Sequence, residues 1–547
     1  MYRLIQTQSK NVGDHSIACF RHSLKIGVQI QNDGALFKHA FRSIHLFFFL
    51  ASILNKMSKI SFISLLIFNL STITPIRAHE DTLNTHSFSH SLLETFSSNG
   101  APFNQPVEVS PIELVCPKRA DLMAKYLYAK LREWGTSCAF GQEVYYNHLK
   151  VWNEFYEESP RKINFSDFLT SFNALLDSIK SQGFDPMRPI PVRMNGVINN
   201  GAHRVTSCLL YQKKITLELD EGKCECDFNF FKTRGLQSLY LDAMALQYCE
   251  LKPQTYIMTV FPSAKGKEAL IEGLIKKYAE IVYAKEVYLT CEGGFHFILT
   301  AYEGESFLDE NSNYRGARHK AQLCFPPDLS LKNPMRVYLL EAKDLDLIKQ
   351  CKKEIRNECH ISNHSVHSTD THQQAITLAR TLFNDNSIHC LNHRKERAVP
   401  QFTRYFEKYR QWLNAQYEKS EWFIIDSGAV LAAYGLRDAH DVDVLQYGED
   451  SFDFPLPGIE NHHDQLHYHT LPLDELMFNP NNYFYYKGIK FCSLSVLKQM
   501  KQKRKEAKDL VDLKLIEELD TKKIPNRERR KSPPSWWLPI GNRASGA

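Results

Sequence analysis

Several patterns that often assign a function are missing from this sequence. Its 13 cysteines include no two pairs at zinc-finger spacing, and Cys224 and Cys226 form a lone C-x-C, shorter than the C-x2-C of a zinc knuckle. A dense disulfide framework is a property of short secreted domains, so most of these cysteines are expected to be small buried hydrophobic residues. No internal repeat is found. These absences argue against a zinc-finger protein, a disulfide-stabilised small domain and a repeat protein.

Charge of one sign and long apolar runs are also scarce. The formal net charge is only +5 over 547 residues, and the basic residues lean toward the far C-terminus. A solvated tail explains this uneven distribution of basic residues as well as contact with nucleic acid or a membrane would. Both interpretations therefore stay open. With 43% hydrophobic and 24% charged residues, the composition is that of a globular protein, neither disordered nor spanning a membrane many times. The length predicts about three domains.

The N-terminal part carries a targeting pattern. Downstream of Met57, Lys59 precedes an apolar run over residues 60–73, and a polar stretch then ends at Ala78. A charged start, a short apolar core and a small final residue are typical of a signal peptide, and the run is short for a transmembrane helix. Residues 57–78 are therefore predicted to be a signal peptide for export or, because residues 44–54 are also apolar, part of an uncleaved membrane anchor. If translation starts at Met57, residues 1–56 are an extension assigned in error to the protein.

The remaining chain is predicted to be a multidomain α/β (α+β) protein. A linker covers residues 79–110, three globular regions cover residues 111–250, 251–397 and 398–520, and a basic flexible tail covers residues 521–547. Apolar periodicity predicts helices over residues 121–134, 165–183, 267–282 and 372–383, with Ser166-Asp167 and residues 368–370 as N-terminal caps. Apolar runs predict strands over residues 255–262 and 295–302.

The last globular region contains the most informative motif, WFIIDSGAVLAAYGLRDAHDVDVLQYG, over residues 422–448. It predicts a strand, a tight turn at Ser427-Gly428, a short helix and a second strand. Asp441 and Asp443 lie on one face of that second strand, because side chains alternate with a period of two. Such a pair suits Mg²⁺, which prefers carboxylate and phosphate oxygens and neutralises charge during nucleotidyl transfer. The helix N-terminus after the turn offers N–H groups to a triphosphate.

Downstream, LKQMKQKRKEAKDLVDLKLI over residues 497–516 predicts two helices with a basic face. Together with the turn, YGLR and DVDV, this segment resembles the minimal bacterial nucleotidyltransferases of the DNA polymerase β-like superfamily, which include some toxins. The resemblance, which covers about a fifth of the chain, implies that Asp441 and Asp443 hold Mg²⁺ (or Mn²⁺). The residues expected to contact the nucleoside triphosphate are Ser427, Gly428, Arg437, Lys501, Arg504 and Lys508. For Lys501, Lys508 and Asp509, the resemblance implies either contact with the nucleotide or support of the fold.

Two departures from the family pattern bear on catalysis. The turn reads Ser-Gly where the family has Gly-Gly or Gly-Ser, and the third carboxylate, which the family takes from a later strand, is not obvious. Asp464 is taken as that third catalytic acid, with Asp474 as a second candidate. The expected activity is nucleotidyl transfer to an unknown acceptor, which could be a sugar, a lipid headgroup, RNA or a protein. The alternative is a non-catalytic module that binds nucleotide or phosphate, or recognises a glycan or a partner.

A second segment, VINNGAHRVTSCLLYQK over residues 197–213, resembles the ParB/sulfiredoxin-like fold, in which a G-x-H-R turn opens a helix. Gly201 lets the backbone approach a ligand, the helix N-terminus favours an anion, and Arg204 can hold phosphate through two N–H groups. His203 could assist proton transfer. A second phosphate-binding site is therefore predicted here, and a surface turn with a capped helix is the alternative. The sulfiredoxin cysteine is not evident in the turn, so that activity is not expected.

Overall fold

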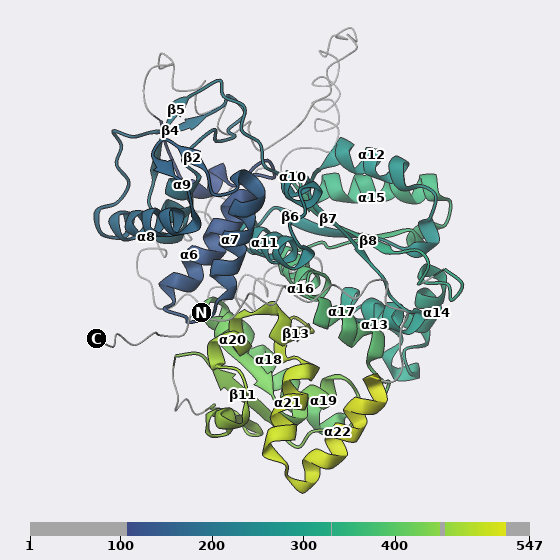
Figure 1. Ribbon diagram of the computed structural model, residues 1–547. Helices are drawn as coiled ribbons and strands as arrows, with labels where there is room; N and C mark the ends of the chain where they lie inside the picture. The colour runs from purple at the N-terminus through teal and green to yellow at the C-terminus, as the bar shows by residue number, and fades with distance from the viewer. Residues whose placement is uncertain (1–106, 330, 449–453, 521–547) are drawn as a thin grey trace, which may run out of the picture. The chain divides into compact units, whose positions relative to one another are not determined.

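A computed structural model describes residues 107–329, 331–448 and 454–520, which form four β-sheets with helices packed around them (Figure 1). The predicted mixed α/β class is confirmed. Within these three stretches, we find no helix with the length and apolar character needed to cross a bilayer. The predicted extension, signal peptide or anchor, and basic tail lie outside the described residues.

The first sheet is built around the segment that resembles the ParB/sulfiredoxin-like fold. Its strands lie in the order β1 (Val107–Val109), β5 (Ile215–Leu219), β4 (Ile190–Val192). Strands β4 and β5 are parallel and are connected through helix α9 (Ala202–Tyr211), which begins directly after the predicted turn at Gly201. The other elements here are α6 (Asp121–Glu133), α7 (Phe140–Asn153), the hairpin β2 (Glu157–Glu158) and β3 (Arg161–Lys162), α8 (Phe165–Gln182), α10 (Phe228–Thr233) and α11 (Ser238–Leu251).

The second sheet is antiparallel and carries helices on both faces. Its order is β7 (Glu280–Val287), β8 (Met335–Glu341), β6 (Thr255–Val260), β9 (Val366–Ser368). Alternate residues of β6 serve opposite faces: Met258 packs with helices α12 (Glu268–Tyr278) and α15 (Leu345–Cys359), and Ile257 belongs to the main core with α16 (His372–Leu382). Helices α13 (Cys291–Ala301), α14 (Arg315–Cys324) and α17 (Asp385–His393) complete this region.

The strand predicted over residues 295–302 is wrong, because these residues lie within or just after helix α13. The Thr290 hydroxyl accepts a hydrogen bond from the Gly293 N–H and caps this helix. Phe295, Phe297 and Ile298 are all buried, so the helix is apolar on much of its circumference. A short apolar run of this kind does not distinguish a strand from a buried helix.

Two predicted helix caps are displaced in the structure. The side chain that caps α8 belongs to Asn164, which accepts from the Asp167 N–H, and Ser166 is already inside the helix. Helix α16 is capped by Thr371 in a capping box with Gln374, rather than by residues 368–370. The helix predicted over residues 267–282 ends at Tyr278, because the following residues enter β7.

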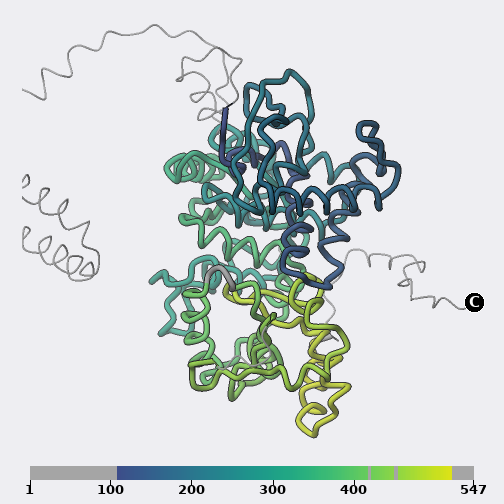
Figure 2. The backbone as a smooth tube through the Cα atoms, turned by 90° about the vertical axis from the view of Figure 1, so that its left-hand side faces the viewer, coloured from purple at the N-terminus to yellow at the C-terminus, as the bar shows by residue number. Residues whose placement is uncertain are grey.

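The third sheet is mixed and carries the nucleotidyltransferase-like motif. Its order is β12 (Ile459–Asn461), β11 (Val442–Gln446), β10 (Phe423–Asp426), β14 (Ile489–Cys492), β13 (Tyr483–Tyr486). β11 runs antiparallel to β10 and parallel to β12. Its helices are α18 (Pro400–Ala415), α19 (Gly428–Ala433), α20 (Leu473–Phe478), α21 (Leu494–Arg504) and α22 (Ala507–Asp520). Figure 2 shows the last two in yellow beside the green segments of this region.

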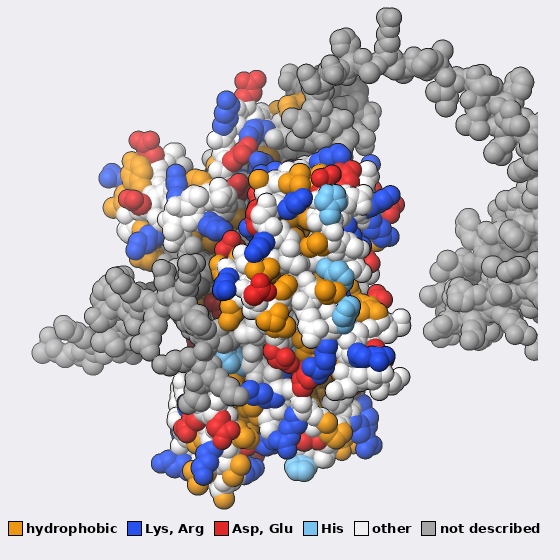
Figure 3. All heavy atoms as spheres, turned by 90° about the vertical axis from the view of Figure 1, so that its right-hand side faces the viewer, with side chains coloured by type: hydrophobic (Ala, Val, Ile, Leu, Met, Phe, Trp, Pro, Cys, Tyr) orange, Lys and Arg blue, Asp and Glu red, His pale blue; other side chains and the backbone are white. Residues whose placement is uncertain are grey.

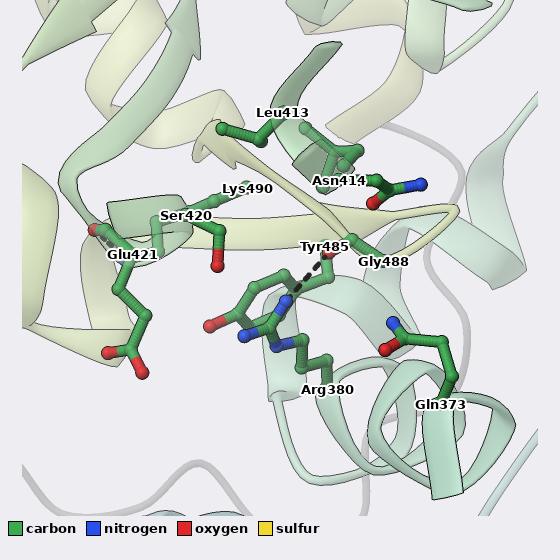
Figure 4. Close-up of a pocket in the computed structure, with 10 residues that line it drawn as sticks. Gln373, Arg380, Leu413, Asn414, Ser420, Glu421, Tyr485, Gly488 and Lys490 are labelled. Atoms are coloured by element: carbon green, nitrogen blue, oxygen red, sulfur yellow. Dashed lines mark hydrogen bonds between the residues drawn. The ribbon is translucent and has the colours of Figure 1, made fainter. Parts of the chain in front are cut away.

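Buried and partly buried charges link helices of the first two regions to each other and to the segments of the third sheet. Lys130 of α6 lies 3.3 Å from the Glu421 carboxylate, and Arg380 of α16 lies 3.0 Å from Glu250 of α11. Lys490 of β14 donates to the backbone carbonyl of Glu421 at 3.0 Å, and burial lowers its pKa to about 8. Figure 4 shows Arg380, Glu421 and Lys490 around one pocket. Because these charged side chains form ion pairs and hydrogen bonds with other protein groups, we assign the cluster a structural role.

Candidate active site

Three carboxylates meet on two neighbouring strands of the third sheet. Asp441 precedes β11, Asp443 is inside it, and Glu460 lies on β12 directly opposite Asp443. One carboxylate oxygen of each acid lies within 4.8 Å of the others. An all-oxygen group of this kind suits Mg²⁺ or Mn²⁺. The structure thus brings the predicted aspartate pair together with a third acid.

The three acids concentrate negative charge at a partly buried position. Burial raises the pKa of Asp443 to about 6, against the opposing influence of His462 and with the help of Asp441 and Asp426. A divalent cation would stabilise the ionised carboxylates, because it supplies positive charge where burial and like charges disfavour them. The donor set and its charge therefore fit a divalent metal ion.

Glu460, rather than the predicted Asp464, is the acid grouped with Asp441 and Asp443. Asp464 follows β12 in a short 3₁₀ helix, accepts from the Gln465 side chain at 2.8 Å, and is not in the group of three. Asp474 accepts from the Ser137 hydroxyl at 2.7 Å, where α20 meets the segment after α6. Glu460 was missed because a strand of three residues has too little pattern to be recognised, and its pairing with β11 is set by the sheet.

A buried aspartate and two histidines form a hydrogen-bonded cluster next to the three acids. Asp426 is fully buried at the end of β10 and accepts from His462 Nδ1 at 3.1 Å and His469 Nε2 at 2.8 Å. Burial opposes ionisation of Asp426, but the two histidines hold its pKa well below the usual range. His462 Nε2 lies 4.0 Å from the Asp443 carboxylate. Asp426 therefore orients the His462 ring, which lies near the candidate metal ligand Asp443 at a distance longer than a hydrogen bond.

The Ser427-Gly428 turn packs against Arg437. Ser427 has a φ of 55° and a ψ of −133°, an uncommon conformation for a residue with a side chain, and it hydrogen-bonds to Asp443. A Cβ added at Gly428 would lie 3.2 Å from the Arg437 guanidinium. Arg437 also makes two bonds to Asp512, of 2.6 and 2.9 Å, yet keeps part of its side chain exposed. The turn, the arginine and the acids are therefore grouped as predicted.

Lys501 and Arg504, which were predicted to contact the triphosphate, form ion pairs with acidic side chains of the protein. Lys501 lies 3.0 Å from Asp509 and 2.7 Å from Asp512, and it is only 1% exposed. Arg504 makes two bonds to Asp509, of 3.0 and 2.8 Å. These pairs fasten α21 to α22, so Lys501 and Asp509 have the fold-supporting role that the resemblance also allowed. Lys508 is exposed and pairs with Glu506 at 3.1 Å.

In the second predicted site, the side chains contact the protein itself. Gly201 has a φ of 83°, and a Cβ there would lie 2.7 Å from Ile190. Arg204 donates to the Pro189 carbonyl at 3.3 Å, which ties α9 to the segment before β4. His203 Nε2 lies 2.8 Å from the Tyr145 hydroxyl, and desolvation of the ring holds its pKa well below the usual range. These contacts support the alternative of a structural turn, and phosphate binding here stays a prediction.

We expect Gly435→Ala, in the YGLR turn, to destabilise the chain more than Gly304→Ala does. Both glycines have positive φ, of 65° and 85°, so each alanine meets the same cost of about 1–2 kcal/mol. A Cβ at Gly435 would also lie 2.1 Å from the Lys395 carbonyl, whereas nothing lies within 4 Å at Gly304. Overpacking adds about 1–3 kcal/mol at Gly435 alone. Urea unfolding of both variants measures the difference, and equal losses would contradict the close approach.

Comparison with protein-family models, curated proteins and solved structures yields no match for this chain.

Proposed function

We propose that residues 398–520 catalyse metal-dependent transfer of a nucleotidyl group from a nucleoside triphosphate to a hydroxyl or phosphate acceptor. One observation carries the proposal: Asp441, Asp443 and Glu460 place carboxylate oxygens within 4.8 Å of one another. A divalent cation held there would neutralise charge on the phosphate oxygens and help align the reacting groups. The adjacent Ser427-Gly428 turn and Arg437 support the placement of the triphosphate beside these acids.

Individual residues of the chain are assigned separate roles in the proposed reaction. Asp441 and Asp443 would bind the cation, and the Gly428 backbone and the Arg437 guanidinium would orient the triphosphate. Glu460 is the exposed member of the group, so it is suited to accept the proton of the acceptor. The acceptor oxygen then bonds to the α-phosphorus while the bond from that phosphorus to the bridging oxygen breaks, and pyrophosphate leaves.

A non-catalytic nucleotide-binding module is the second candidate. It is favoured by the engagement of Lys501 and Arg504 in ion pairs, which leaves fewer cations for the triphosphate. The third carboxylate discriminates between the two candidates, because proton removal from the acceptor requires an acid beside the metal-binding pair. Glu460 occupies that position, so we favour the enzyme.

The proposal is tested by calorimetric titration of MgATP, MgCTP, MgGTP and MgUTP into the full chain. We expect at least one nucleotide to bind in a metal-dependent way. Asp441→Asn combined with Asp443→Asn should weaken that binding by at least about tenfold, because these carboxylates would hold the cation that accompanies the triphosphate. Asp464→Asn is the matched control and should bind as the wild type does. A folded wild-type chain that binds none of the four nucleotides would refute the proposed function.

A further inference from the structure

A histidine outside the candidate active site has a ring nitrogen without a hydrogen-bond partner. His296 lies on α13 and is only 2% exposed. Its Nδ1 lies 2.8 Å from the Leu391 carbonyl, and a carbonyl only accepts, so Nδ1 carries the proton and donates. The opposite nitrogen, Nε2, is buried and has no partner. In this tautomer Nε2 presents a lone pair, which is the form of imidazole that binds metal ions.

Two glutamates lie beside this histidine. Glu292 precedes His296 by four residues, so both side chains lie on one face of α13. Glu396 comes from the segment after α17, a helix that packs against α13. One ring nitrogen of His296 and one carboxylate oxygen of each glutamate lie within 4.8 Å of one another. Because Nδ1 is bonded to a carbonyl, Nε2 is the nitrogen available to complete this group.

We propose that Glu292, His296 and Glu396 bind a divalent transition-metal ion of the zinc type, independently of the proposed nucleotidyl transfer. One imidazole nitrogen and two carboxylates form a three-ligand set, and the exposed glutamates leave a further position open to water. An imidazole ligand favours zinc, copper, iron or nickel over magnesium, whose usual ligands are all oxygens. The site therefore differs in metal preference from the three carboxylates on β11 and β12.

Contacts with the surrounding protein hold two of the three side chains in place. The Nδ1–H bond to the Leu391 carbonyl fixes the ring orientation, as outer hydrogen bonds do for metal-binding histidines. Arg318 of α14 pairs with the Glu396 carboxylate and lies over the Phe295 ring, which holds that glutamate in position. Figure 3 shows a face of the chain on which acidic and basic side chains are interspersed. We attribute a preference of the group for a cation to its three ligands.

Metal binding at this group would also fix the segment that follows α17. In that segment the Lys395 N–H donates to the Tyr434 carbonyl at 2.9 Å, and Arg397 donates to the Leu436 carbonyl at 2.8 Å. Both acceptors belong to the YGLR turn that leads to Arg437. The ion would thus connect α13 to the turn beside the candidate active site.

The test is calorimetric titration of Zn²⁺ into the full chain after chelator treatment, with excess Mg²⁺ to occupy the carboxylate site. We expect a zinc site in the wild type and in the Asp441→Asn/Asp443→Asn variant. His296→Ala and Glu292→Gln should each weaken it by at least about tenfold, since even outer partners of metal ligands contribute that much. Glu292→Gln conserves shape on an exposed side chain, so it keeps the test valid if His296→Ala does not fold.

His319→Ala removes an exposed histidine of α14 and is the matched control, which should bind zinc as the wild type does. Three results would overturn the proposal: no zinc bound by the wild type, zinc bound unchanged by Glu292→Gln, or zinc lost only in the Asp441→Asn/Asp443→Asn variant. The last result would place the ion at the carboxylate site and would leave the proposed nucleotidyl transfer intact.

Discussion

Glu460→Gln is expected to lower the rate of nucleotidyl transfer by about 10²–10⁴-fold, the usual contribution of a positioned proton acceptor. Glutamine keeps the shape of the side chain but neither accepts a proton at neutral pH nor contributes negative charge to the cluster. Asp441 and Asp443 remain, so nucleotide binding should fall much less than turnover does. The measurement is pyrophosphate release with Mg²⁺ and the nucleotide that binds best in calorimetry.

Asp464→Asn is the control for this experiment. It removes an acid four residues further along the chain, outside the group of three carboxylates, and should leave turnover close to that of the wild type. If Asp464→Asn abolished turnover while Glu460→Gln preserved it, the assignment of the third acid would be reversed. Loss of turnover in both variants, with both chains folded, would mean that the two acids act together.

Asp121→Asn is expected to destabilise the chain by about 3–5 kcal/mol, the usual effect of removing one member of a buried ion pair. Asp121 is fully buried and accepts from Arg119 at 2.8 and 2.9 Å and from Lys125 at 2.7 Å. Cys226 Sγ also lies 3.1 Å from this carboxylate. Without the carboxylate, two buried cations lose their counter-charge. Urea unfolding followed by far-UV circular dichroism measures the loss.

The acid-induced unfolding of the wild type should reflect the same cluster. Burial opposes ionisation of Asp121, but Arg119 and Lys125 hold its pKa well below the usual range. A carboxylate whose folded-state pKa is lowered contributes stability above its unfolded pKa, about 3.9, and loses it as the pH falls toward the folded value. The difference in unfolding free energy between the wild type and Asp121→Asn should therefore be constant near neutral pH and should shrink in acid.

Asp177→Asn is the matched control for Asp121→Asn. The ion pair between Arg132 and Asp177 has a similar distance, 2.8 Å, but its aspartate side chain is 62% exposed. An exposed pair contributes about 0–1 kcal/mol, so this variant should unfold almost as the wild type does. Equal losses for Asp121→Asn and Asp177→Asn would contradict the assigned burial of the Asp121 cluster.

The local parts of the candidate site could be predicted from the sequence, and the parts that depend on distant pairing could not. Asp441 and Asp443 share a strand, so the alternation of side chains places them together without knowledge of the fold. Glu460 joins them only because β12 pairs with β11 in parallel register. That register depends on the whole sheet, and a strand of three residues does not reveal it.

A basic face on α21 could be predicted, but its partners could not. Lys501 and Arg504 have the spacing of cations on one helical face, which suits a triphosphate and an adjacent acidic helix equally well. The structure turns α22 back onto α21, so that Asp509 and Asp512 reach these cations. The strand predicted over residues 295–302 failed for a related reason, since an apolar run shows burial without showing the element that is buried.

The parallel pairing of β11 with β12 makes the candidate active site sensitive to whether one edge strand has docked. The pairing of β10 with β11 places Asp443 opposite Asp426, and Asp441 lies just before the same strand. Glu460 arrives only after the chain crosses back to lay β12 beside β11. A chain in which β12 has not docked would thus hold a weak two-acid site, and the site is complete only with this edge strand in place. Under the proposed function, a partly folded chain would leave nucleoside triphosphates intact.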